Sequence, residues 1–200
     1  MSPQDRRAAI VGAALAVMQR QGIAATTVRD VAAEMGTSSG LIHHYFASMD
    51  DLVAAAFEES ASHDLEESLA AMRQGHDPVE RLARFLATYA RADQDRAIQL
   101  WLDAWAEAPR RPALQRISRR LNEEWQRQLA VVIRDGVAAG RMTCEDPDAA
   151  GWQLLSLLDG LALQTVAHPS SITHEQAASW SRQQAENVLG LAPGSLVLDD

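Results

Sequence analysis

The sequence predicts an all-α protein of about nine helices, and three observations support this prediction. Along most of the chain, apolar residues recur at the three- and four-residue intervals of an amphipathic helix. Long stretches lack the strict alternation expected of half-buried strands. Glycine and proline separate the periodic segments, where they can end or begin helices. With 47% hydrophobic residues, a chain of 200 residues can form one larger domain or two small ones that share an interface.

The first predicted helix covers Gln4–Gln21 and ends at Gly22. Its buried stripe consists of Ile10, Ala14, Val17 and Met18. A second, shorter helix begins at Val28, because Thr27 precedes it and can cap its free N–H groups. The apolar stripe of this helix is Val28, Val31, Ala32 and Met35.

A tight turn joins the second helix to a very short third helix, Ser38–Phe46. Gly36 stands where a left-handed backbone costs least without a Cβ. The third helix has Ile42 and Phe46 on one side, and its other side carries Ser39, Gly40, His43 and His44. Two helices joined in this way form a helix-turn-helix unit, whose second helix suits a DNA major groove. On the motif alone, an ordinary helical corner with solvent-facing histidines remains an alternative.

Six further helices complete the chain. The fourth begins at Met49, capped by Ser48, and runs to about Gln74, so that it links a first domain to a second. Breaks such as Gly75-His76-Asp77-Pro78 then separate helices over about 78–91, 93–108, 112–139, 147–167 and 173–189. The predicted domains are residues 1–50 and 51–190, followed by a loose tail at 191–200.

Residues 6 to about 58 resemble the N-terminal domain of the TetR family of bacterial transcriptional repressors. The resemblance is carried by the amphipathic first helix ending in QGIAATTVRDVAAEMG, and by the segments SSGLIHHYF and SMDDL. It implies that Thr27 and Arg29 meet phosphates or base edges. It implies that His43 and His44 enter the groove and that Tyr45 reaches a phosphate. The tip of the recognition helix is then formed by Thr37, Ser38, Ser39 and Gly40.

This sequence departs from the family pattern at three of these positions. His43 replaces the usual tyrosine, and Met49 and Ala47 stand where lysine is frequent in the family. We therefore expect weaker non-specific DNA affinity than in a typical member, because neutralisation of phosphates supplies most of that affinity.

The net charge of −9 is unevenly distributed. All 18 basic residues are arginine; four of them face four acids in residues 1–50, and 14 face 23 acids in residues 51–200. The neutral N-terminal part can approach DNA, whereas the acidic remainder is repelled by it.

Aromatic residues of the second domain suggest a site for a small-molecule effector. Its candidate ligand-binding residues are Phe85, Tyr89, Trp101, Trp105 and Trp125. Aromatic walls can hold a quaternary ammonium group, and Asp103 or Asp159 could balance its charge. The alternative is that these side chains, together with Trp152, only fill a helical core.

The last two helices have apolar faces beyond what one chain needs to close its core. They predict a homodimer with a four-helix interface, with Trp152, Leu155, Leu158, Ala162 and Trp180 as the candidate interface residues. Burial of these faces within a single chain is the alternative. The segments LWLDAWAEAPRRPALQRISRRLNEEWQRQL and WQLLSLLDGLALQ loosely resemble the C-terminal domain of the choline-responsive, BetI-like subgroup of the family.

The remaining residues indicate no catalysis and no bound metal or cofactor. Cys144 is the only cysteine, the six histidines lack metal-ligand spacing, and the paired acids point to different helix faces. No apolar run is long enough to span a membrane, so we expect a cytoplasmic protein.

Taken together, these features predict a ligand-responsive transcriptional regulator that represses by binding double-stranded, palindromic operator DNA as a homodimer and is released by an unidentified small molecule. The alternative is a helical small-molecule-binding protein or enzyme that does not bind DNA.

Overall fold

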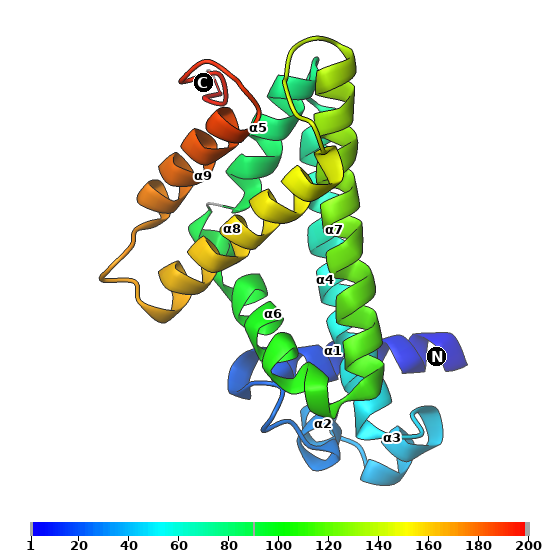
Figure 1. Ribbon diagram of the computed structural model, residues 1–200. Helices are drawn as coiled ribbons and strands as arrows, with labels where there is room; N and C mark the ends of the chain where they lie inside the picture. Colours follow the sequence, from blue (N-terminus) through cyan, green and yellow to red (C-terminus); the bar gives the residue numbers. More distant parts are fainter. Residues whose placement is uncertain (1, 90, 199–200) are drawn as a thin grey trace. The chain divides into compact units, whose positions relative to one another are not determined.

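The computed structural model describes residues 2–89 and 91–198, and within them it contains nine α-helices, two short 3-10 helices and no strand (Figure 1). The predicted all-α fold is confirmed. The helices are α1 (Pro3–Gln21), α2 (Val28–Glu34), α3 (Ser39–Tyr45), α4 (Met49–Arg73), α5 (Pro78–Tyr89), η1 (Ala92–Gln94), α6 (Asp95–Glu107), η2 (Ala108–Arg110), α7 (Pro112–Ala138), α8 (Pro147–Ala167) and α9 (His174–Val188). None of the helices so described is long and apolar enough to cross a membrane.

Several helices begin where a local side chain satisfies their free N–H groups. Ser2, Thr27, Asp146 and Thr173 cap α1, α2, α8 and α9. Ser48 does the same for α4, because its Oγ accepts from the Asp51 N–H at 3.0 Å. The predicted caps at Thr27 and Ser48 are therefore confirmed.

The helices form two compact units, and each is discontinuous in sequence. The first unit combines Met1–His63 with Gln99–Leu121, and the second combines Asp64–Ile98 with Asn122–Asp200. Helices α4, α6 and α7 contribute residues to both units. The units do not coincide with the continuous ranges 1–50 and 51–190, because proline and glycine mark where the chain turns, whereas a long helix can pass from one core to another without a break.

Each unit has an aliphatic and aromatic core. Fully buried side chains of the first unit include Ile10, Met18, Ile42, Phe57 and Leu114. Those of the second include Leu82, Phe85, Leu86, Leu129 and Ile133. The burial of these side chains supplies the main favourable free energy of folding.

The segment predicted to be a loose tail packs on the second unit over its described part, 191–198. Leu196 is 1% exposed, and its N–H donates to the Glu186 carboxylate at 3.0 Å. The prediction was wrong here because one apolar side chain and one long-range hydrogen bond anchor a segment that lacks helical periodicity. Residues 199–200 lie outside the described part of the chain.

Candidate functional site

The helix-turn-helix prediction corresponds to α2, α3 and the turn between them. Gly36 has a φ of 61°, the left-handed backbone predicted for this position. The N–H groups of Gly36 and Thr37 donate to the Ala33 and Ala32 carbonyls at 3.1 and 2.9 Å, which closes the end of α2. The apolar sides face inward, since Val31, Ala32, Ile42 and Phe46 are all buried.

The polar residues of this unit lie at the surface. Thr27, Arg29, Ser38, Gly40, His43 and His44 are exposed, and Thr37, Ser39 and Tyr45 are half-buried. The His44 ring meets the Tyr45 ring edge-on, with centroids 5.2 Å apart. All nine predicted DNA-contacting residues are thus accessible, and His43 and His44 are not buried against the chain's own body.

Two of these residues differ in how free their hydroxyls are. The Thr27 hydroxyl donates to Asp30 Oδ2 at 2.6 Å, and this hydrogen bond is the main reason that the pKa of Asp30 lies below its usual value. The Ser38 hydroxyl makes no capping bond to α3. Ser38 can therefore donate to a DNA phosphate without breaking an existing contact, whereas Thr27 first has to release a carboxylate.

Gly40 leaves room at the tip of α3 that the fold itself does not need. A Cβ at this position would meet only Ser38 Oγ, at an ordinary 3.7 Å. The absence of a side chain therefore suits the close approach of another molecule.

Sequence reasoning missed a contact that supports the helix-turn-helix unit from behind. The Arg7 guanidinium lies over the Phe46 ring, 4.8 Å from its centroid, in a cation–π contact. Arg7 precedes Phe46 by 39 positions, so no local spacing could have indicated this pair.

The predicted effector residues are divided between the two units. Trp101 and Trp105 of α6 belong to the first unit, where the Trp101 ring lies 4.8 Å from Phe57 and 5.5 Å from Trp105. Phe85, Tyr89 and Trp125 belong to the second unit and contact one another, with centroids 5.4 to 5.6 Å apart. These five candidates therefore do not belong to one compact unit, because α6 and α7 each contribute to two cores.

Of the two acids considered as counter-charges, only Asp159 has a carboxylate that remains available. Asp103 lies in the first unit and accepts hydrogen bonds from the Ile23 N–H and the Gln99 side chain, at 3.4 and 3.0 Å. Asp159 has no hydrogen-bond partner among the residues that the structure describes. Burial raises the pKa of Asp159 to about 7. An unpaired, half-buried carboxylate of this kind is suited to a cationic partner.

Tyr89 connects this acid to a small cavity in the second unit. Burial, with the charges of Asp159 and Asp64, raises the pKa of Tyr89 well above its usual value. Tyr89 lines the cavity together with Leu158, Leu161, Ala162, Thr165, His174, Ala177 and Ser181. The cavity has a volume of about 10 Å³, which holds about one water molecule.

The predicted dimer-interface residues separate into buried and exposed ones. Leu155, Leu158 and Ala162 are 1%, 4% and 7% exposed, so their side chains are already covered within one chain. Trp152 and Trp180 are 41% and 44% exposed, and Leu163, which the prediction omitted, is 39% exposed. Trp152 and Leu163 are eleven residues apart, which places them on one face of α8. Large apolar side chains therefore remain exposed on α8 and on α9.

The charge of each part differs when the chain is divided into the two compact units instead of at residue 50. The first unit contains nine arginines and nine acids, because residues 99–121 bring five arginines to it. The second unit contains nine arginines and 18 acids. The unit with the helix-turn-helix is neutral, as expected, but it carries more cations than residues 1–50 alone. No cluster of ligands suited to a metal ion occurs among the described residues.

The N-terminal and the C-terminal parts of the chain each match a known protein family. Residues 10–56 match the model of the tetR family of bacterial regulatory proteins, and residues 78–190 match that of the BetI-type transcriptional repressor C-terminal domain. The HTH-type transcriptional regulator BetI of Rhizobium meliloti (strain 1021) is 29% identical over 87% of this chain and 84% of its own length.

Two solved structures have the same fold. A transcriptional regulator from Pseudomonas aeruginosa PAO1 superposes with a TM-score of 0.82, at 26% identity over 94% of this chain and 91% of its own. One from Saccharomonospora viridis, solved in complex with choline, has a TM-score of 0.84 at 23% identity, over 93% of this chain and 98% of its own.

Proposed function

We infer the function from one premise: the chain belongs to the TetR family of bacterial transcriptional regulators and has a BetI-type C-terminal domain. It is a ligand-responsive transcriptional regulator and not an enzyme. We propose that it acts as a homodimeric repressor. In this proposal the dimer binds a palindromic operator on the chromosome, in the cytoplasm, and a small organic cation releases it.

The accessible polar side of α3 is the observation that carries the DNA-binding part of the proposal. A short helix with Ile42 and Phe46 buried behind it and His43 and His44 in front can enter a major groove. The neutral charge of the first unit supports this approach, since the acidic second unit is repelled by phosphate. Two copies related by a two-fold axis then read half-sites spaced by one or more helical turns of about 34 Å.

The effector proposed here is an organic cation of the quaternary ammonium class. Phe85, Tyr89 and Trp125 supply π faces, and Asp159 supplies a negative charge without a competing hydrogen bond. Choline is the first candidate, because the similar regulator of Saccharomonospora viridis was solved with choline.

Binding such a cation requires the second unit to open. A cavity of about 10 Å³ is far smaller than the roughly 300–1,000 Å³ of typical ligand sites. The ligand therefore favours a conformation in which the residues around Tyr89 have moved apart, and this difference in affinity is what can couple effector to operator.

The uncovered face of α8 and α9 supports the proposed dimer. Trp152, Leu163 and Trp180 are large apolar side chains at the surface, and pairing two such faces buries them. Replacing Trp152 and Trp180 with serine should therefore shift the protein from dimer to monomer in sedimentation equilibrium, with unchanged helix content. A dimer of unaltered dissociation constant would place the interface elsewhere.

The DNA-binding part is tested by footprinting the protein on the DNA upstream of its own gene and then titrating that site. His44→Ala should lower the affinity about 5- to 150-fold, as expected for about 1–3 kcal/mol from a base contact, with an unchanged melting temperature because the side chain is exposed. His168→Ala, an exposed histidine of the second unit, is the control and should bind like the wild type. Equal affinity of both variants would favour a ligand-binding protein that does not read DNA through α3.

The effector part is tested by repeating the titration with saturating choline. A coupling of about 1–3 kcal/mol predicts a 5- to 150-fold loss of operator affinity. If choline and larger quaternary ammonium ions all leave the affinity unchanged, the proposed effector class is wrong.

A further inference from the structure

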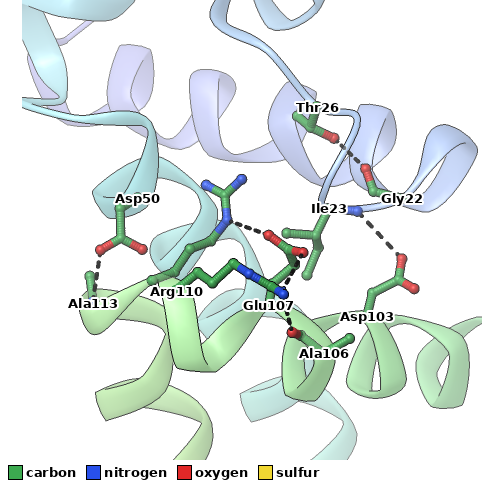
Figure 2. A network of polar contacts seen from close by, with 10 residues as sticks. Gly22, Ile23, Thr26, Asp50, Asp103, Ala106, Glu107, Arg110 and Ala113 are labelled. Atoms are coloured by element: carbon green, nitrogen blue, oxygen red, sulfur yellow. Dashed lines mark hydrogen bonds and ion pairs between the residues drawn. The ribbon is translucent and has the colours of Figure 1, made fainter.

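Within the first unit, α6 and the start of α7 each form a hydrogen bond with the N-terminal part of the chain (Figure 2). Asp103, on α6, accepts from the N–H of Ile23 in the turn between α1 and α2, at 3.4 Å. Asp50, in the first turn of α4, accepts from the N–H of Ala113 in the first turn of α7, at 2.8 Å. The bonded residues are 80 and 63 positions apart in sequence. In both contacts a carboxylate of one segment is bonded to the backbone of the other.

Asp50 acts as a cap for α7 that comes from elsewhere in the chain. The residue before α7 is Arg111, whose side chain contains no hydrogen-bond acceptor and bonds Glu107 instead. Asp50 supplies the missing acceptor and also a negative charge at the start of a helix. Its second oxygen, Oδ1, is buried and has no partner among the residues described. The Asp50 carboxylate is therefore directed at α7 alone.

Asp103 lies close to the backbone of Gly22. Gly22 ends α1 with a φ of 83°, and a Cβ there would come within 3.1 Å of Asp103 Oδ2. The other oxygen, Oδ1, is held by Gln99 at 3.0 Å, one helical turn earlier. The Thr26 hydroxyl donates to the Gly22 carbonyl at 2.7 Å and orders the turn that Asp103 contacts. The contact is thus built from both sides.

The connection between α6 and α7, residues 108–111, is called the α6–α7 joint, and two further contacts hold it. Arg111 and Glu107, both 19% exposed, form an ion pair of 3.1 Å across it. The Arg110 guanidinium reaches the Ala106 carbonyl at the end of α6, at 3.5 Å. These contacts link the end of α6 to the residue that precedes α7.

We propose that Asp50 and Asp103 are positioning residues for operator binding: they fix α1, α2, α3 and the start of α4 on the α6–α7 joint and so set the direction in which α3 points. This inference rests on the proposed function, because a direction matters only if two copies of α3 must meet two half-sites at once. Neither residue contacts DNA in this arrangement.

Two DNA probes separate positioning from folding: a duplex with the footprinted palindrome, and the same duplex with one half-site scrambled. A misdirected α3 still binds a single half-site, whereas it cannot fit both half-sites together. For Asp103→Ala and for Asp50→Ala we expect affinity for the palindrome to fall about fivefold or more, with half-site affinity within about twofold of wild type. The asparagine variants should retain more of the palindrome affinity, because an amide oxygen can accept from the same N–H groups.

Glu59→Ala is the matched control, since it removes one exposed carboxylate from α4 in the same unit. Circular dichroism verifies folding; if Asp103→Ala does not fold, Gln99→Ala replaces it, because losing the bond to Gln99 frees the carboxylate and should also lower the palindrome-to-half-site ratio. An unchanged ratio in the folded variants, or an equal loss on both probes, overturns the inference. If the wild type itself shows no preference for the palindrome, the proposed function fails instead.

Discussion

Each compact unit contains an aromatic cluster, and the two clusters differ in what the neighbouring carboxylate does. In the first unit, Trp101 packs between Phe57 and Trp105, and Asp103 on the same helix is bonded to the backbone of Ile23. In the second unit, Tyr89 packs against Phe85 and Trp125, near the unbonded carboxylate of Asp159.

Aromatic residues at helical spacing therefore do not distinguish a core from a binding site. The partner of the acid does so, because a carboxylate that already accepts backbone N–H groups has little left for a ligand, whereas a buried one without a partner is stabilised by any cation that reaches it.

The largest effect is expected from removing the charge that distinguishes the second cluster. Asp159→Asn should weaken choline binding about 30-fold or more, equivalent to about 2 kcal/mol, because the cation loses its buried counter-charge. Isothermal titration calorimetry measures this directly. Glu175→Gln removes an exposed acid of the same unit and should bind choline like the wild type. Full choline affinity in Asp159→Asn would show that the two clusters do not differ in the proposed way.

The pH dependence of the second unit follows from the same group. The pKa of Asp159 is about 7, so choline affinity should rise up to about tenfold per pH unit below 7 and level off above it. Tyr89 stays neutral in this range, because its pKa is raised. The other titratable groups around Tyr89 are Asp64 and, beside the cavity, the Asp95–His174 pair. Calorimetry between pH 5.5 and 8.5 tests the rise, and Asp159→Asn should make it disappear.

The stability of the folded protein should change with pH in the opposite direction to choline affinity. The folded protein binds the Asp159 proton more tightly than the unfolded chain, so stability falls as pH rises from about 4 to about 7, by at most about 4 kcal/mol. Above pH 7 the whole cost is present, and Asp159→Asn should melt at a higher temperature than wild type there. The two should converge near pH 4, and a constant difference across the range would contradict the burial of this carboxylate.

Smaller effects are expected from exchanging one aromatic ring in each cluster. Trp125→Leu should lower choline affinity about 3- to 10-fold, as expected for the loss of one cation–π contact. Trp101→Leu should lower the melting temperature, for a cost of about 1–3 kcal/mol, and leave choline affinity unchanged. Thermal melts and calorimetry on both variants test this contrast, which fails if Trp101→Leu also weakens choline.

The smallest change in choline affinity is expected from replacing Asp103. Both of its oxygens are bonded within the first unit, so Asp103→Asn should leave choline affinity within about twofold of wild type. Calorimetry gives the answer, and a loss like that of Asp159→Asn would make Asp103 a ligand residue after all.

Much of this fold was predictable because its signals are local. The caps Thr27 and Ser48 precede their helices directly, and Gly36 follows the end of α2, where its backbone has a positive φ. The exposed side of α3 also followed from spacing, since Ile42 and Phe46 claim its other side. The resemblance to a known family then assigned a DNA-contacting role to that surface.

The positioning contacts were not predictable in this way. Asp50 resembles an ordinary acid in the first turn of its own helix, yet its carboxylate caps α7 instead. From the sequence, Asp103 could be the counter-charge of a cationic ligand, but its carboxylate is bonded to a turn 80 residues earlier.

The sequence by itself determined the helices, the turn at Gly36 and the polar surface of α3, because each depends on residues within a few positions of one another. Only the tertiary structure decided which acid remains unbonded and which ring belongs to which core. These outcomes depend on side chains that come together from distant segments, and hydrogen bonding or burial at such places leaves no periodicity in the chain.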